Sequence, residues 1–383
     1  HYEANPSIIA MGYAFVANHK KVEFYRTNYQ ANANLIAQAY ALAGHHKKVK
    51  EYRKLHKVNI DTIIQGYASG GYHAKVEKYL TQYPMYSHAA GQGYAIAANH
   101  EKAAEYRTSQ QNINLIAQSY ALAGNHEKVE EYRIEYKASP DWIAQGYAIA
   151  GNHEKVLEYI SGYKANIHLI VQGYAIVGNH RKVEEYRTEH QADPCWITRG
   201  YALGDYHTKV EEYRKKYRLD TKAILSFYAL GANHAKVEEY RLKHQLNITT
   251  IAKIYNELPQ ENVPPLYSVI NFLSQQGELG QELIKIIERL KKGQDSYWNP
   301  YWSNSGTKLG ILISAIEEAR QLETNLIDLI EDKDSRLHKA LNRQRLAAIT
   351  FFGEVGLNQA KSLIALNDFI SYQSSLNKLE FKF

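Results

Sequence analysis

The sequence predicts an all-α protein in which an α-solenoid of 27-residue helix-pair repeats is followed by a C-terminal helical bundle. Near-identical segments recur at a fixed period, each period opens on a helix-capping residue, and each holds two short stretches with helical apolar spacing. "GYAIAGNHEKV" occupies residues 146–156 and "GYAIVGNHRKV" occupies residues 173–183, which is 27 places later. A unit this short cannot bury its own apolar face, so consecutive units are expected to stack.

One tyrosine per unit, here named the marker tyrosine, sets the frame of the repeats. The step between markers is 27 residues, except for a single step of 26 between Tyr94 and Tyr120. Tyr255 begins a tenth unit that loses the pattern at "NELPQENVPP", as expected where a solenoid is capped. We therefore expect about nine repeats and a capping half-repeat over residues 1–256, and a helical domain over residues 257–383. The nine markers are Tyr13, Tyr40, Tyr67, Tyr94, Tyr120, Tyr147, Tyr174, Tyr201 and Tyr228.

Each unit is predicted to form two antiparallel helices. A small residue, usually Gly, stands four places after the marker, where a left-handed backbone can end the first helix. The second helix reads His-x-Lys-Val-Glu-Glu-Tyr-Arg. An alanine follows the marker in all nine units, which predicts a close crossing of neighbouring helices in a right-handed-type solenoid. With Tyr86 the exception, the predicted caps eight places before the markers are Asn5, Asn32, Asn59, Asn112, Ser139, Asn166, Asp193, Asp220 and Asn247.

The repeat resembles two known families of helix-pair repeats. "YALGDYHTKVEEY" (201–213) resembles the tetratricopeptide pattern, in which a tyrosine, a glycine and a second aromatic residue mark two antiparallel helices. Units that combine "IAQGY", "AGN" and "KVEEY" are similar to the pentatricopeptide repeat. The resemblance covers roughly residues 5–256, and the unit here is shorter than the about 34 residues of those families. It implies a stacked helix-pair architecture that binds an extended ligand.

The last third of the chain carries helical apolar spacing without the period. Residues 268–292 predict two helices around Gly277 and Gly280, and further helices are expected over 309–332, 335–352 and 358–372. "YWSNSGTK", with "AIEEA", "LHKALNRQR" and "AKSL" further on, resembles a tail of repeat-containing effectors of intracellular bacteria. That resemblance implies secretion into the cytosol of a host cell. The single cysteine of the chain is compatible with such a reducing compartment.

Four side chains stand at fixed places after the marker. Histidine follows it by six, lysine by eight and a second tyrosine by twelve places in all nine units, and arginine follows by thirteen in seven. In the structural interpretation Tyr faces the stack, His closes the turn and Lys pairs with Glu three or four residues on. In the alternative, Lys and Arg form a ladder that matches a charged polymer. The ladder candidates are Lys48, Lys75, Lys102, Lys128, Lys155, Lys182, Lys209, Lys236, Arg107, Arg133, Arg187 and Arg214.

One position changes from unit to unit, and it lies six places before the marker at the second residue of the first helix. In pentatricopeptide proteins a residue near this point takes part in base recognition, so the resemblance implies a specificity position. The alternative is an exposed helix start with no constraint on its side chain. After Ser7 in the first unit, the variable helix starts are Asn34, Asp61, His88, Asn114, Asp141, His168, Cys195 and Lys222.

These patterns predict a non-catalytic scaffold for an extended macromolecule, most simply a partner protein. The alternative is a modular nucleic-acid binder that reads one nucleotide per repeat, and an enzyme within residues 257–383 is a third hypothesis. Residues 1–250 hold 31 Lys and Arg against 24 Asp and Glu, a balance of +7, and the remainder holds 15 against 16. We expect no catalytic site, metal, cofactor, small-molecule substrate or membrane span. The nucleic-acid hypothesis requires the lysines and the variable helix starts to lie on one continuous surface.

Overall fold

The computed structural model describes residues 5–56, 58–258, 263–295, 303–342 and 366, and the chain divides into two compact units, residues 1–244 and 245–383. Across these described ranges the chain forms helices and no strand, which confirms the predicted all-α fold. Consecutive helices pack as neighbours, so the repeated units form a solenoid.

The first unit contains nine helix pairs, one for each marker tyrosine, joined by short turns. The first helices are α1 (Pro6–Phe15), α3 (Ala33–Leu42), α5 (Ile60–Ser69), α7 (Ser87–Ile96), α9 (Gln110–Leu122), α11 (Pro140–Ala150), α13 (Ile167–Ile176), α15 (Pro194–Leu203) and α17 (Thr221–Leu230). The second helices are α2 (His19–Tyr29), α4 (His46–His56), α6 (His73–Gln82), α8 (His100–Glu105), α10 (His126–Ile134), α12 (His153–Tyr163), α14 (His180–Glu189), α16 (His207–Tyr217) and α18 (His234–Lys243). A 3-10 turn, η1 (Pro84–Tyr86), precedes α7.

Side-chain caps set the helix starts. Asn166 and Asp193, for example, each accept a hydrogen bond from the backbone N–H two residues further on, as predicted. Six of the nine second helices are capped as well, by an asparagine five places after the marker such as Asn152. His45, Tyr72 and Tyr206 hold this place before α4, α6 and α16. The prediction for Asn112 is wrong. In the unit that is one residue short, α8 has six residues and α9 starts earlier, so Ser109 is the cap and Asn112 lies inside the helix.

The turn between the two helices is left-handed in every repeat. Four places after the marker φ is positive at all nine positions, including Ala17, Ala98, Asp205 and Ala232, where the residue is not glycine. An L-residue in this conformation costs roughly 1 kcal/mol. The left-handed turn is therefore kept even where a residue other than glycine makes it unfavourable. This turn reverses the chain direction within about two residues.

The core lies between adjacent first helices, where small residues allow a close approach. A Cβ atom added to Gly146 would meet the carbonyl oxygen of Gln118 at 2.4 Å and the Cβ of Ala121 at 3.0 Å. A Cβ atom added to Gly173 would likewise lie 3.1 Å from the Cβ of Ala148. The alanine after each marker is thus at a helix crossing, as predicted.

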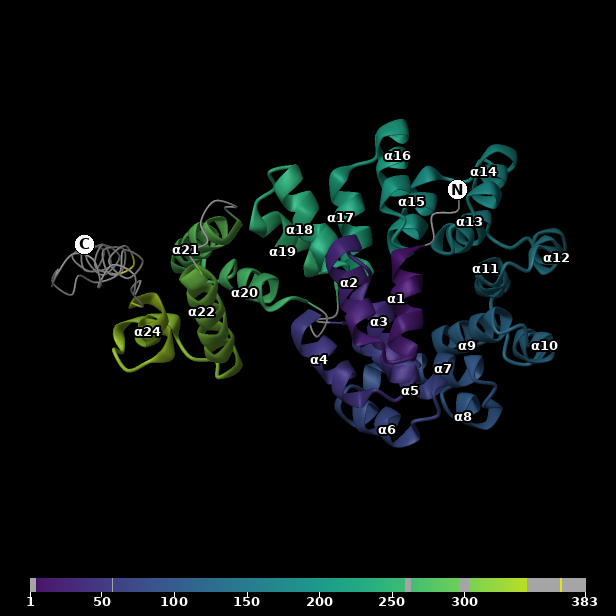
Figure 1. Ribbon diagram of the computed structural model, residues 1–383, viewed down its shortest axis with the longest axis horizontal. Helices are drawn as coiled ribbons and strands as arrows, with labels where there is room; N and C mark the ends of the chain where they lie inside the picture. Colours follow the sequence, from purple (N-terminus) through teal and green to yellow (C-terminus); the bar gives the residue numbers. More distant parts are fainter. Residues whose placement is uncertain (1–4, 57, 259–262, 296–302, 343–365, 367–383) are drawn as a thin grey trace, which may run out of the picture. The chain divides into compact units, whose positions relative to one another are not determined.

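Seven repeats complete one turn of the first unit, because the eighth repeat returns to the first. The amide of Asn5 donates to the carbonyl of Gly204 at 2.7 Å, and the hydroxyl of Ser7 donates to the carboxylate of Asp205 at 2.7 Å. One repeat further on, the amide of Asn34 donates to the carbonyl of Gly231 at 2.9 Å. The second helices α4 to α16 lie on the outside of this turn (Figure 1).

The second unit contains α19 (Ile248–Tyr255), α20 (Pro265–Leu273), α21 (Gly277–Asp295), α22 (Ser303–Gln321), α23 (Leu326–Glu331) and α24 (Arg336–Asn342). The rings of Tyr255 and Tyr267, twelve places apart, stack at 4.9 Å, so α19 and α20 keep the tyrosine pair of a repeat. α19 belongs to this unit, although its residues fall within the range 1–256 predicted for the solenoid. The helix expected over 358–372 lies outside the described residues apart from Leu366. Of the tail segments that resemble bacterial effectors, residues 301–302, 343–345 and 360–363 lie outside the described residues as well.

Candidate interaction surface

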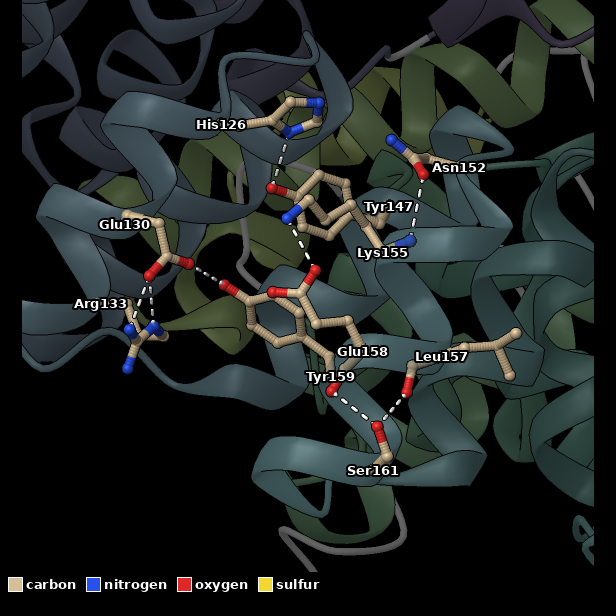
Figure 2. Close-up of polar contacts among 10 residues, drawn as sticks. All are labelled: His126, Glu130, Arg133, Tyr147, Asn152, Lys155, Leu157, Glu158, Tyr159 and Ser161. Carbon is tan, nitrogen blue, oxygen red and sulfur yellow. Dashed lines mark hydrogen bonds and ion pairs between the residues drawn. The ribbon is translucent and has the colours of Figure 1, made fainter.

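The repeated histidines join neighbouring repeats. In seven repeats the Nδ1 atom of this histidine lies 2.9–3.3 Å from the hydroxyl oxygen of the next marker tyrosine, as His126 does with Tyr147 (Figure 2). Burial lowers the pKa of several of these histidines, and it lowers that of His207 to about 4. The neutral ring is therefore favoured in the stack, which supports the structural interpretation of this position.

The second repeated tyrosine also joins neighbouring repeats, through a glutamate that lies ten places after the preceding marker. The hydroxyl of Tyr159 donates to Glu130 at 3.0 Å, and Arg133 donates to the other carboxylate oxygen of Glu130 (Figure 2). Hydrogen bonding to Arg133 lowers the pKa of this carboxyl. The same arrangement links the arginines, glutamates and tyrosines Arg26–Glu23–Tyr52, Arg187–Glu184–Tyr213 and Arg214–Glu211–Tyr240.

A further aromatic position, not predicted from the sequence, completes this network. Tyr or His stands sixteen places after the marker in eight of nine repeats, and its ring lies within 4.9–5.5 Å of the second repeated tyrosine in seven of them. In three repeats the arginine of the preceding repeat lies over this ring, as Arg107 does over Tyr136 at 4.3 Å and Arg133 over Tyr163 at 4.5 Å. The four ladder arginines therefore all have partners inside the stack.

Most ladder lysines are paired within their own helix. Each pairs with a glutamate three residues further on, and such a pair contributes only a few tenths of a kcal/mol. Lys155 and Glu158 in α12 show the contact (Figure 2). Lys75 has no ion pair among the described residues. The paired lysines and glutamates are Lys48–Glu51, Lys102–Glu105, Lys128–Glu131, Lys155–Glu158, Lys182–Glu185, Lys209–Glu212 and Lys236–Glu239.

The variable helix starts have a structural use as well. The side chain at this position accepts a hydrogen bond from the backbone N–H of the next repeat's capping residue in five repeats, with distances of 2.7–3.2 Å. Ser, Asn, Asp and His all supply a short-range acceptor. Asp61 instead accepts from Thr62, and His88, Cys195 and Lys222 form no such bond with the described residues. The five acceptors are Ser7, Asn34, Asn114, Asp141 and His168.

The lysines and the variable helix starts lie at opposite ends of each helix pair. Lys155 is the third residue of α12, beside the end of α11, whereas Asp141 is the second residue of α11. About nine residues of helix, roughly 14 Å, separate the two levels. The two sets therefore lie at different levels of each helix pair, the lysines beside the end of the first helix and the variable residues at its start.

The first three repeats lack part of this internal pairing. Most repeats have glutamate ten places after the marker, and most have it eleven places after the marker. In repeats 1–3, three of these six places hold Phe24, Lys50 and Lys78 instead. Residues 1–82 consequently hold 11 Lys and Arg against 5 Asp and Glu, whereas residues 83–244 hold 20 against 19. Within the described part of the chain seven lysines of α2, α4 and α6 form no ion pair. We name this set the basic surface, and it consists of Lys20, Lys21, Lys47, Lys50, Lys54, Lys75 and Lys78.

Apolar side chains are exposed beside these lysines. Phe24 and Tyr29 of α2 are 47% and 52% exposed, and their rings lie 5.8 Å apart. The Nζ atom of Lys21 lies 5.8 Å from the ring centre of Phe24. Leu55 of α4, 63% exposed, directly follows Lys54. The outer face of the first repeats therefore combines unpaired positive charge with apolar area.

Comparison with protein families, with curated proteins and with solved structures found no match for this chain. Among the helices that the structure describes, none is long and apolar enough to cross a membrane. The described side chains also contain no group of three or more His, Cys, Asp or Glu placed to hold a metal ion.

Proposed function

We propose that the protein is a non-catalytic repeat scaffold that binds an extended partner protein through the outer faces of its second helices. One observation carries this proposal. Most of the polar residues that recur in the repeats are bonded to the next repeat or paired within their own helix, whereas the outward positions vary between repeats. Seven places after the marker, for example, the residue is Lys20, Lys47, Ala74, Glu101, Glu127, Glu154, Arg181, Thr208 and Ala235.

A rigid frame with a variable outer face suits protein recognition. Because neighbouring repeats are joined by hydrogen bonds at several levels, little ordering of the scaffold is needed when a ligand binds. The partner then contacts successive helices, each of which contributes different side chains.

The resemblances noted in the sequence belong to this proposal. A tetratricopeptide-like or pentatricopeptide-like stack is an architecture for ligands that contact several repeats. The tail resemblance adds a setting, in which the protein acts as a bacterial effector and its partner is a protein of the host cell.

The test is an affinity selection on the full chain. A displayed library of random peptides and pools of RNA, single-stranded DNA and duplex DNA are offered in parallel. The proposal expects peptides to be enriched and to remain bound at physiological salt. Enrichment of nucleic acid alone, with affinity that falls steeply with salt, would support the nucleic-acid alternative and overturn the proposal. A selection that enriches neither class also overturns it.

A further inference from the structure

We propose that the basic surface of α2, α4 and α6 binds an acidic polypeptide segment that carries apolar side chains between its carboxylates. This inference rests on the proposed function and specifies where the partner binds and which chemistry it presents.

The positive charge of this surface arises from local departures from the repeat. In the later repeats a glutamate ten places after the marker pairs with arginine, and a glutamate eleven places after it pairs with lysine. Lys50 occupies the first of these places in α4, and Lys78 occupies the second in α6. Each substitution removes a carboxylate and adds an ammonium group. The outer surface of repeats 1–3 is therefore positive, whereas that of the later repeats is nearly neutral, and the buried tyrosines and alanines are the same in both.

The lysines of α4 are arranged as one stripe. Lys47, Lys50 and Lys54 are three and four residues apart, so they lie on the same face of the helix, and all three are exposed. α2 lies beside α4, because the hydroxyl of Tyr52 in α4 donates to Glu23 in α2 at 2.5 Å. Lys20 and Lys21 at the start of α2 extend the positive surface on that side. An extended segment of several residues can therefore contact lysines from more than one repeat.

The apolar side chains favour a polypeptide over a nucleic acid. Phe24, Tyr29 and Leu55 are about half exposed or more, and an aliphatic side chain such as Leu55 gains nothing from a phosphate backbone. The aromatic residues that repeat in the stack are not available for base stacking, since Tyr40 and Tyr52 are each 1% exposed. An acidic segment with leucine or phenylalanine between its carboxylates matches both features of the surface.

Charge reversal at two lysines gives the sharpest test. K50E and K78E introduce the glutamates that most other repeats have at these places, so the variant K50E/K78E is expected to fold normally. K164E/K215E is the matched control, because Lys164 and Lys215 are exposed and lie outside the basic surface. Both double variants change the net charge by the same amount. Circular dichroism and thermal unfolding verify that both variants are folded.

The probe is a fluorescein-labelled peptide of four Glu-Glu-Leu-Ser units, measured by fluorescence anisotropy with the full chain. The expected result is binding that K50E/K78E weakens by about tenfold and that the control leaves within about twofold. Replacing leucine by serine in the peptide is expected to weaken binding further. Equal losses in both variants would overturn the inference, and so would tighter binding of an oligothymidylate of the same charge.

The two proposals fail in different ways. If peptides from the library selection bind the chain but neither carry acidic residues nor respond to K50E/K78E, the scaffold stands and the acidic partner is wrong. If no peptide binds at any site, both are wrong.

Discussion

Repeats 1–3 and repeats 5–9 share one frame but have different outer surfaces. In both regions histidine contacts the next marker tyrosine, and the turn between the helices is left-handed. In repeats 5–9 each ladder lysine has a glutamate partner, whereas in repeats 1–3 only Lys48 does. The comparison teaches that residues fixed in every repeat hold the stack together. We therefore propose that a binding surface is marked by departures from the repeat and not by the repeat itself.

The largest expected effect concerns the contact that joins the two regions. The carboxylate of Asp205 in repeat 8 accepts hydrogen bonds from Ser7 at 2.7 Å, Asn233 at 3.0 Å and Asn32 at 3.5 Å. The replacement D205A leaves these buried donors without an acceptor, so we expect a loss of about 2–4 kcal/mol in urea unfolding. We also expect faster hydrogen exchange in α1 and α3. D205N keeps the shape and is expected to retain most of the stability. Equal losses in the two variants would show that the hydrogen bonds are not what closes the turn.

A smaller effect is expected at the helix crossings that both regions share. The replacement G146A places a methyl group against the backbone of Gln118, which is 2.4 Å away, and we expect about 1–3 kcal/mol of destabilisation. G162A in α12 is the control, because nothing lies within 4 Å of a Cβ added there. Helix propensity predicts that this control gains about 0.5–1 kcal/mol. Thermal unfolding compares the two, and a similar change in both would contradict the close crossing.

Acid is expected to weaken the stack through its histidines. Burial lowers the pKa of His207 to about 4, so its contribution is present above its unfolded pKa of about 6.5 and is lost as pH falls through 4. Asp205 acts in the opposite direction: burial raises its pKa to about 6, so its contribution is present below about 4 and is lost as pH rises through 6. The histidines with lowered pKa in the first unit include His19, His46, His153, His180 and His207.

Because several histidines oppose one aspartate, we expect the melting temperature to fall between about pH 7 and pH 4.5. The variant D205N is expected to fall more steeply, since it lacks the group that gains stability in acid. A melting temperature that rises steadily over this range would contradict the role given to the histidines.

The smallest expected effect is on the stability of repeats 1–3 themselves. K50E supplies a carboxylate three residues before Arg53, and K78E supplies one three residues after Lys75. Each pair is expected to add a few tenths of a kcal/mol, which urea unfolding of K50E/K78E can detect as a small gain. A large loss of stability would mean that Lys50 or Lys78 has a structural role.

The stacked helix-pair architecture of this molecule could be predicted from sequence, because the same residues recur at a fixed spacing of 27. Each repeated residue type meets a local need. The alanine after the marker allows a close helix crossing, and most capping residues accept a hydrogen bond from a backbone N–H at a helix start. Asn112 was misassigned because one missing residue shortens α8 and moves the start of α9 to Ser109. That shift depends on the packing of two helices and not on the local pattern.

The partners of the repeated side chains were harder to predict than their positions. The Tyr159–Glu130 bond joins residues 29 apart, and the Ser7–Asp205 bond joins residues 198 apart, so neither follows from helical spacing. The aromatic residue sixteen places after the marker recurs in eight of nine repeats, so the period itself carries the signal for this position. The closure after seven repeats depends on small rotations accumulated over the whole stack, which no single unit encodes.

The most direct test of the central claim compares two sets of lysines in one binding measurement. Lys128, Lys155, Lys182 and Lys209 are replaced by Gln in one variant, and Lys47, Lys50 and Lys54 in another. Anisotropy with the acidic peptide then gives the affinity of each. If the lysines of the later repeats only pair within their helices, the first variant keeps its affinity within about twofold and the second loses about tenfold. Loss of affinity in the first variant, with the second unchanged, would contradict the account.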